Sequence, residues 1–373
     1  MARRFFQSAI AVLIALVCGW LVIIPVGSLE AGWRTADRAW AAEFPRDHGD
    51  HADFKTEWWY FTGNLRAKGG REFGYQLTIF RQGVIPPDER VERRSRFVAN
   101  DVYLAHFGLS DLAGGSYLHG QEVSRGAYGE AGTADEGERV AWVGPSEVWF
   151  LEGGNEIRIR GEGDGAELKL TLASEKSPVF HGRDGVSQKA AGVGRASHYY
   201  SLTRLATSGT VTVDGEEFAV KGLSWFDHEW ATNQLGEDQV GWDWFSLQFD
   251  DGTELMLFQI RKRGGGRDEY SSGTFVDTEG VGVAISDEDF SLEPVRNWAS
   301  EATGGEYPVE WKVAVPKLGI DLVVEARMDA QEQVLEPVAY WEGSVRASGS
   351  RTGLGYLEMT GYAGEIVGMR AGE

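Results

Sequence analysis

Cysteine is almost absent from this chain of 373 residues. The single cysteine, Cys18, lies inside an apolar run near the N-terminus. Its predecessor in Leu16-Val17-Cys18-Gly19 is not the small residue that a lipid-attachment motif needs. The remainder of the chain therefore has no disulfide and no thiol chemistry.

Basic residues are also scarce. The chain has 36 lysines and arginines against 57 aspartates and glutamates, which gives a formal net charge of -21. A nucleic-acid partner requires a basic surface, so this composition argues against one. It also argues against a chain that lies flat on an anionic membrane surface.

Several familiar catalytic motifs are missing. No Gly-x-Ser-x-Gly elbow is followed by Asp and His in order, and Gly192-Val193-Gly194 lacks the context of a phosphate-binding loop. His48, His51 and Asp53 are close in sequence, but no compact pair of ligands follows them. We expect a solvated, turn-forming connector there, no metal site and no cofactor.

After the first 30 residues the chain shows no long amphipathic helix. It has 50 glycines and 14 tryptophans, and its apolar stretches are short and separated by turn residues. Gly69-Gly70, Asp214-Gly215 and Asp250-Asp251-Gly252 each lie between two such stretches, which predicts three hairpins. The pattern predicts an all-β sandwich or barrel.

The N-terminus has the features of an export or anchoring segment. Arg3 and Arg4 precede an uncharged run from residue 5 to residue 29, which is long enough to span a bilayer. The basic start predicts a cytoplasmic N-terminus with the rest exported. We expect a single-pass cell-membrane protein with a periplasmic part, or a periplasmic protein if this segment is a cleaved signal peptide.

The rest of the chain divides into a connector and two strand-rich regions. Residues 30–56 are polar, and the strands after them are interrupted by a polar stretch at residues 233–238. The predicted organisation is an N-terminal segment (1–29), a connector (30–56), a first β domain (57–233) and a second β domain (234–373).

Aromatic side chains gather at two places. Glu57 precedes Trp58-Trp59-Tyr60-Phe61, and Trp242 and Trp244 flank Asp243. Side chains alternate along a strand, so Trp58 and Tyr60 share one face while Glu57, Trp59 and Phe61 share the other. Such strands are buried on both faces or line a cavity on one of them.

An ionisable run lies among further aromatics. Asp227, His228 and Glu229 lie between Phe226 and Trp230. Burial raises the pKa of a carboxyl group and lowers that of an imidazole, which suits proton transfer. We expect at least one of these carboxylates at a cavity wall with His228 in hydrogen-bond reach of it. The alternative is a surface turn with solvated charges.

Three segments resemble those of one known family. Residues 44–65 (FPRDHGDHADFKTEWWYFTGNL), residues 179–211 and the GLSWFDHEW segment are similar, in this order, to the AttH/carotenoid 1,2-hydratase family. The resemblance runs from about residue 44 to the C-terminus and implies two lipocalin-like antiparallel β-barrel domains. It also implies activities that range from hydration of a terminal double bond to pericyclase-like catalysis. Members encoded beside ABC transporters are known as well. His228 and Trp230 match the spacing of a His and a Trp in the carotenoid hydratases.

Two functions are compatible with these features. One is an exported protein that takes up a hydrophobic lipid or isoprenoid and catalyses hydration or isomerisation of an alkene. The other is a non-catalytic lipid-binding component that works with the permease and ATPase of an ABC transport system. The candidate catalytic residues are Asp227, His228, Glu229 and Glu57, and the candidate ligand-binding residues are Trp58, Tyr60, Tyr199, Tyr200, Trp230, Trp242 and Trp244.

Overall fold

The computed structural model describes residues 32–90, 98–335 and 338–364. The N-terminal apolar segment predicted at residues 1–29 lies outside this part. Helical structure among the described residues is confined to short 3-10 turns, and no helix there is both long and apolar enough to cross a bilayer. The turns are η1 (Arg46–His48), η2 (Pro87–Glu89), η3 (Ala127–Gly129), η4 (Glu152–Gly154), η5 (Asp287–Asp289) and η6 (Pro316–Leu318).

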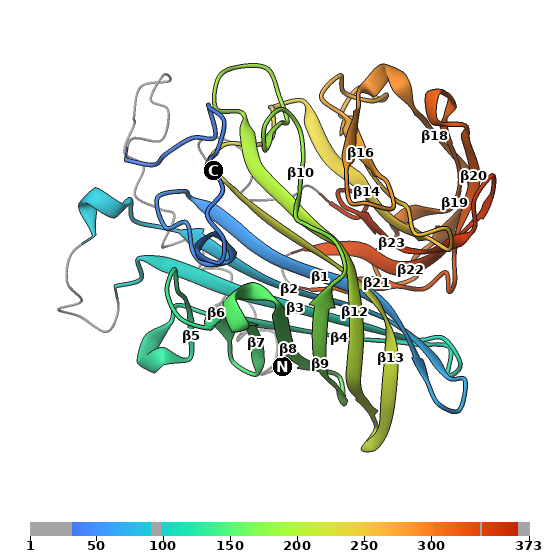
Figure 1. Cartoon of the computed structure of the whole chain (residues 1–373), viewed down its shortest axis with the longest axis horizontal. Coiled ribbons are helices and arrows are strands. Elements are labelled where there is room, and N and C mark those ends of the chain that lie inside the picture. The colour runs from blue at the N-terminus through green and yellow to red at the C-terminus, as the bar shows by residue number, and fades with distance from the viewer. Residues whose placement is uncertain (1–31, 91–97, 336–337, 365–373) are drawn as a thin grey trace, which may run out of the picture. The chain divides into compact units, whose positions relative to one another are not determined.

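The first sheet has thirteen antiparallel strands and curls into a near-barrel (Figure 1). Its main path runs β4-β3-β2-β1-β13-β12-β9-β8-β7-β6-β5, and β10 and β11 pair with β12. The strands are β1 (Thr56–Ala67), β2 (Glu72–Gly83), β3 (Asp101–Asp111), β4 (Ser116–Ser124), β5 (Ala131–Thr133), β6 (Arg139–Val143), β7 (Ser146–Leu151), β8 (Glu156–Gly163), β9 (Ala166–Ser174), β10 (Val179–Phe180), β11 (Val186–Gln188), β12 (Ala196–Val213) and β13 (Glu216–Ala231).

Two glycines allow the curled sheet to close on itself. A Cβ atom on Gly120 of β4 would lie 2.9 Å from the Cα of Gly163 of β8, and one on Gly163 would lie 2.8 Å from the backbone nitrogen of Gly120. The backbones of these two strands therefore touch where any side chain would separate them. The interior is an apolar core that includes Trp59, Phe61 and Phe226.

The second sheet has ten antiparallel strands and forms a half-barrel around a core of its own. Its main path runs β17-β16-β15-β14-β23-β22-β20-β19-β18, and β21 pairs with β22. The strands are β14 (Gln239–Phe249), β15 (Glu254–Lys262), β16 (Ser272–Val276), β17 (Gly282–Ile285), β18 (Ser291–Ala299), β19 (Glu306–Val315), β20 (Ile320–Ala326), β21 (Glu332–Val334), β22 (Ala339–Gly349) and β23 (Gly353–Met359).

The all-β fold and the three hairpins predicted from turn residues are confirmed. Gly69-Gly70 joins β1 to β2, Asp214-Gly215 joins β12 to β13, and the turn at residues 250–253 joins β14 to β15. The strands of the first sheet end at residue 231 and those of the second begin at residue 239.

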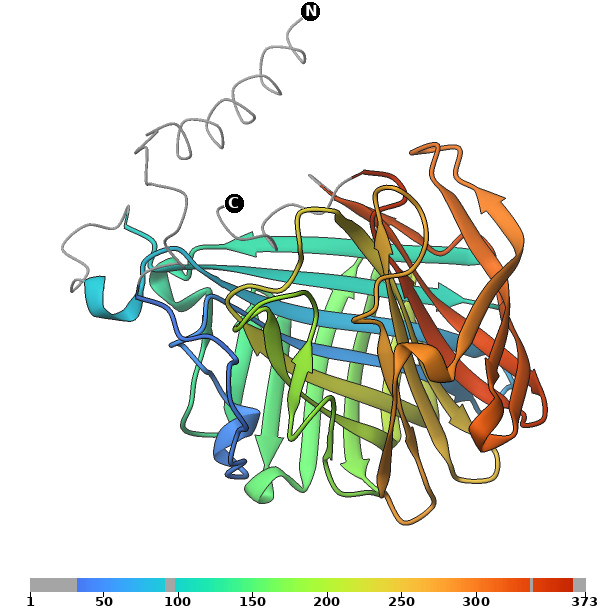
Figure 2. The ribbon, with the colours of Figure 1, turned by 90° about the horizontal axis from the view of Figure 1, so that it is seen from above.

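The two sheets pack against each other through a third apolar cluster and a set of polar contacts. In Figure 2 the red strands of the second sheet lie against the blue and cyan strands of the first. The hydroxyl of Tyr340 lies 2.7 Å from Nδ1 of His106, and Nε2 of Gln333 donates to Gln76 at 3.0 Å. Nδ2 of Asn64 donates to the carbonyl of Gly355 at 3.0 Å. Buried side chains of each sheet thus satisfy polar groups of the other.

The connector is more buried than the sequence indicated. His48 and His51, expected in a solvated turn, are 4% and 8% exposed. The ring of His48 stacks on Phe150 at 4.1 Å, and Nε1 of Trp59 donates to the carbonyl of His48 at 2.9 Å. The connector therefore covers core side chains of the first sheet. Asp53 is exposed, as expected for a solvated turn.

Candidate functional site

Strand β13 divides the predicted Asp227-His228-Glu229 run between two faces of the first sheet. Asp227 lies opposite Tyr60 of β1 and Ser201 of β12, on the face that meets the second sheet. His228 points to the opposite face, into the core of the first sheet. The expectation that His228 hydrogen-bonds Asp227 or Glu229 is therefore wrong, because consecutive side chains on a strand alternate.

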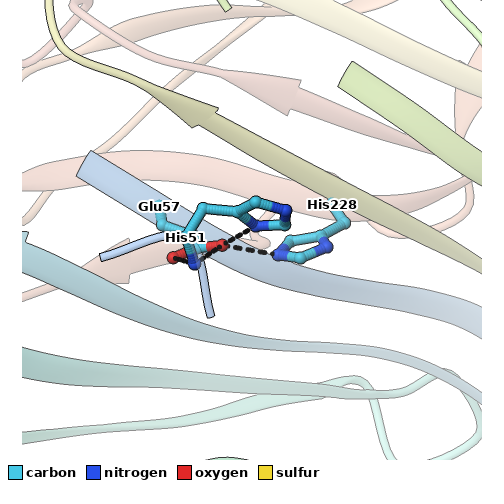
Figure 3. A group of neighbouring side chains, drawn as sticks. All are labelled: His51, Glu57 and His228. Carbon is cyan, nitrogen blue, oxygen red and sulfur yellow. Dashed lines mark hydrogen bonds and ion pairs between the residues drawn. The ribbon is translucent and has the colours of Figure 1, made fainter. Parts of the chain in front are cut away.

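His228 instead belongs to a group that we call the barrel-end cluster, formed by His51, Glu57 and His228 (Figure 3) together with Arg81, which pairs with Glu57. Glu57 is the second residue of β1 and His228 lies near the end of β13, so the group lies at the edge of the first sheet where β1 begins and β13 ends. Oε1 of Glu57 lies 2.8 Å from Nδ1 of His51 and 3.0 Å from Nε2 of His228. A guanidinium nitrogen of Arg81 donates to Oε2 of Glu57 at 3.2 Å.

Charge pairing dominates this cluster. Burial alone would raise the pKa of Glu57, but His51, His228 and Arg81 outweigh it and hold that pKa well below its usual value. Arg81 also reaches Asp50 at 3.0 Å and Asp101 at 3.3 Å. Glu57 is thus ionised and fully buried. Through its contacts with His51, Arg81 and His228 it links the connector, β2 and β13 to β1.

Asp227 has a different environment, which we call the inter-sheet cluster. It comprises Asp227, Tyr60, Tyr199, Ser201, Trp225, Trp244, Glu342 and Glu358. Asp227 accepts hydrogen bonds from the hydroxyl of Tyr199 and from Nε1 of Trp225, both at 2.6 Å, and from Ser201. No Lys or Arg pairs with it among the described residues. Burial raises the pKa of Asp227 to about 7, although the three hydrogen bonds oppose the shift.

His181, which directly follows β10, extends this network into the second sheet. Nε2 of His181 lies 2.7 Å from Oγ of Ser201, and Nδ1 lies 2.8 Å from Oγ1 of Thr274 on β16. Nε1 of Trp244 donates to the hydroxyl of Tyr199 at 3.1 Å. Asp227 is therefore held by side chains that are themselves held by the second sheet.

Two further carboxyl groups reach the inter-sheet cluster from β22 and β23. The hydroxyl of Tyr60 donates to Oε2 of Glu342 at 2.9 Å, and Nε1 of Trp242 donates to Oε1 of Glu358 at 3.1 Å. Burial and the charge of Glu358 raise the pKa of Glu342 well above its usual value. Burial, with the charges of Asp227 and Glu229, raises the pKa of Glu358 to about 8.

Glu342 and Glu358 were missed in the sequence, although a pattern marks them. Each follows a tyrosine by two residues, as Tyr340-Trp341-Glu342 and Tyr356-Leu357-Glu358. On a strand this spacing puts the carboxyl group beside a tyrosine on one face. Which face that would be, and what it would meet, depends on the packing of the sheets.

The remaining predicted residues divide between the two regions. Trp58, Tyr60, Tyr199, Trp242 and Trp244 pack in the apolar cluster between the sheets. Glu229 also faces this side, where Lys189 pairs with it at 3.2 Å. Tyr200 and Trp230 lie in the first core, where the ring of Trp230 stacks on His51 at 3.6 Å. The two faces predicted for β1 are confirmed, since Trp59 and Phe61 also lie in the first core.

One group among the described residues has the ligand types and spacing for a metal ion. It consists of His51, Glu57 and His228, whose ligand atoms all lie within 4.8 Å of one another. Two imidazoles with one carboxylate are typical of zinc and non-haem iron sites.

Known proteins share this fold, and one of them is 33% identical in sequence. A model of the family described as AttH-like matches residues 35–362. A crystal structure from Nitrosomonas europaea assigned to AttH is 33% identical, with a TM-score of 0.78, over 87% of this chain and 97% of that one. Kievitone hydratase from Nectria haematococca superposes with a TM-score of 0.68 at 15% identity, over 89% of this chain and 96% of that one, which is a likeness of fold.

A curated relative matches over a shorter region. Dehydratase asqC from Emericella nidulans is 23% identical over 205 residues, which are 49% of this chain. The chain spans about half the length of that relative, 54%.

Proposed function

Because this chain belongs to the AttH-like family, we propose that it is an acid–base catalyst of the hydratase or dehydratase class that acts on a hydrophobic alkene at the inter-sheet cluster. The observation that carries the proposal is the environment of Asp227: a buried carboxyl group with a pKa of about 7, among aromatic side chains and without a cationic partner among the described residues. A general acid is most effective when its pKa lies near the working pH.

The chemistry follows from these groups. The protonated carboxyl of Asp227 transfers its proton to one alkene carbon, and the neighbouring carbon becomes cationic. The faces of Tyr60, Trp225 and Trp244 stabilise such a cation by roughly 0.5–2 kcal/mol per ring when water is excluded. Water then forms the new C–O bond and loses a proton to a carboxylate, which restores the acid. Dehydration is the reverse sequence.

The polar groups around Asp227 support this role. Ser201, Tyr199 and Trp225 all donate to the carboxylate, so they stabilise the charge that remains after proton transfer. The buried hydroxyls of Tyr117 and Tyr356 lie near Glu342 of the inter-sheet cluster, and within the described residues neither has a hydrogen-bond partner of acceptable geometry. Buried polar atoms of this kind usually bind ordered water or a ligand, and hydration needs a bound water.

The names of two similar proteins point to the same reaction class, since one is a hydratase and the other a dehydratase. We also propose that the protein lies outside the cytoplasm, with residues 1–29 as membrane anchor or signal peptide. This location rests on the sequence of that segment. The alternative function, a lipid-binding component of an ABC transport system, would use the same aromatic cluster without turnover.

The test is isotope incorporation. The purified full-length chain is incubated with short isoprenoid alkenes in ¹⁸O-labelled water, and the products are analysed by mass spectrometry. We expect labelled alcohol from the wild type and from Asp238→Asn, which changes an exposed aspartate in the loop after β13. Asp227→Asn should give none. Native mass spectrometry on the same samples separates the alternatives, because a co-purified lipid with no turnover would contradict catalysis and favour the binding component.

A further inference from the structure

We propose that His51, Glu57 and His228 form a binding site for one divalent transition-metal ion of the zinc type, which fastens the connector to the first sheet. The three residues come from three separate segments: the connector, β1 and β13. Nδ1 of His51, Oε1 of Glu57 and Nε2 of His228 converge on one point (Figure 3), and no two of them are more than 4.8 Å apart.

The imidazole rings of His51 and His228 face more oxygen acceptors than they have N–H groups to donate. Nδ1 of His228 faces the carbonyl of Asp47 at 3.1 Å, and Nε2 of His51 faces Oδ1 of the same residue at 3.3 Å. Their other nitrogens face Oε1 of Glu57. All four ring nitrogens therefore face oxygen acceptors, but two neutral imidazoles carry only two N–H groups, and one contact still lacks a donor when His51 is protonated. A cation between the inner nitrogens and Glu57 removes this conflict.

The charges of the cluster agree with a bound dication. Asp47, Glu57 and Asp101 are buried carboxylates, and the buried guanidinium of Arg81 pairs with Glu57, Asp101 and the neighbouring Asp50. With the more exposed Arg46 and Arg90 included, three guanidinium groups face four carboxyl groups, so the group has no excess of positive charge that would oppose a bound cation. Arg46 and Arg90 reach Asp47 and Asp101 from more exposed positions.

The outer contacts of the two imidazoles are those of metal ligands. Metal-binding histidines usually donate the second N–H to a carboxylate or backbone carbonyl, which orients the ring and its free nitrogen. Asp47 supplies one acceptor of each kind, its own carboxylate to His51 and its carbonyl to His228. Arg81 occupies Oε2 of Glu57, so the carboxylate presents Oε1 to the two rings.

The role of such an ion is structural. Glu57 and His228 are completely buried, and His51 stacks on Trp230 at 3.6 Å. The cluster lies in the first core and Asp227 on the opposite face of the same sheet. The ion would therefore contribute to folding free energy, as structural zinc does. The inference does not depend on the proposed catalysis.

Metal content tests the site directly. The full-length chain is produced in zinc-supplemented medium, dialysed against a weak chelator and analysed by inductively coupled plasma mass spectrometry. We expect about one zinc ion per chain in the wild type and in His119→Gln, and at least roughly tenfold less in His51→Gln and His228→Gln. A wild type without zinc, or ligand variants that keep a full equivalent, would overturn the proposal.

A second measurement needs no variant, in case the ligand variants do not fold. Cobalt(II) is added to the wild-type chain during refolding, since four-coordinate cobalt with nitrogen and oxygen ligands has visible absorption bands that are much stronger than the weak band of the free aqua ion. The bands should saturate at one equivalent and disappear when zinc is added. Refolded protein without such bands, or with bands that zinc does not displace, would count against the site.

Discussion

The barrel-end cluster and the inter-sheet cluster share strands β1 and β13, but the pKa of Glu57 in the first is lowered and that of Asp227 in the second is raised. At the barrel end, Glu57 faces one guanidinium and two imidazoles, and its pKa is lowered. Between the sheets, Asp227 and Glu358 are bonded mainly to hydroxyl and indole groups, and burial raises their pKa values to about 7 and 8. For Glu57 and Asp227 the partners, rather than burial alone, decide whether the carboxyl group is a charge or a proton donor. Asp50 differs, because burial and the charge of Glu57 raise its pKa to about 7 although it faces Arg81.

This contrast separates a structural role from the proposed chemical role within two consecutive residues. Asp227 and His228 are neighbours in sequence, yet one faces the second sheet and the other the first core. A substitution at each should therefore disturb a different property of the protein.

The largest expected effect is on turnover by Asp227→Asn. Loss of a general acid typically costs about 10²–10⁴-fold in rate, and the amide cannot supply the proton. The stability of this variant should fall by about 1–3 kcal/mol, because buried donors lose part of their acceptor. Product formation and urea unfolding on the same sample measure the two effects. Turnover at the wild-type rate in this variant would show that Asp227 is not the general acid, and the two clusters would then not differ in chemical role.

Glu57→Gln should affect stability most strongly. The substitution leaves Arg81 and two imidazoles buried without their carboxylate, and breaking a buried ion pair costs about 3–5 kcal/mol. Chemical denaturation at neutral pH measures the loss. A matched change at the other cluster is Glu342→Gln. A decrease for Glu57→Gln no larger than that for Glu342→Gln would contradict the charge-paired role of the barrel end.

The pH dependence of stability should have opposite signs in the two clusters. The folded-state pKa of Asp227 is about 7 against 3.8 when unfolded, so its contribution is fully present below about pH 4 and is lost as the pH rises towards 7. The slope approaches about 1.4 kcal/mol per pH unit for one group. Glu57 has a lowered pKa, so its contribution is lost only as the pH falls below its unfolded value, near 4.5.

Denaturation midpoints of the wild type and Asp227→Asn at pH 4.5, 5.5, 6.5 and 7.5 test this sign. The variant should lose less stability than the wild type as the pH rises over this range, because an amide does not ionise. Parallel pH curves for the two proteins would show that Asp227 is ionised throughout.

The smallest expected effect is that of Glu342→Gln itself. The pKa of Glu342 is well above its usual value, so the group is protonated at neutral pH and an amide of the same shape replaces a neutral acid. The free energy of unfolding should change by less than about 1 kcal/mol, because one hydrogen bond from Tyr60 is exchanged for a similar one. A loss of several kcal/mol would mean that Glu342 is ionised and paired.

Local features of the fold were predictable from the sequence, and contacts between distant segments were not. Turn residues such as Gly69-Gly70 located hairpins, and alternation placed Trp58 and Tyr60 on one face of β1. The meeting of Glu57 with His51 and His228 requires the connector to fold over the strand ends, which no local pattern encodes. The proximity of Glu358 to Asp227 likewise follows from how the sheets pack.

The hydrogen bonds between the two sheets also affect how cooperatively the protein unfolds. Tyr60 with Glu342, His106 with Tyr340 and His181 with Thr274 each lose a buried partner if one sheet detaches from the other. Orphaned buried polar groups cost about 1–3 kcal/mol each, so a state with one sheet folded and the other melted is penalised several times over. The sheets should therefore behave as a single cooperative folding unit, and a ligand should enter by local opening of loops such as residues 189–195, between β11 and β12.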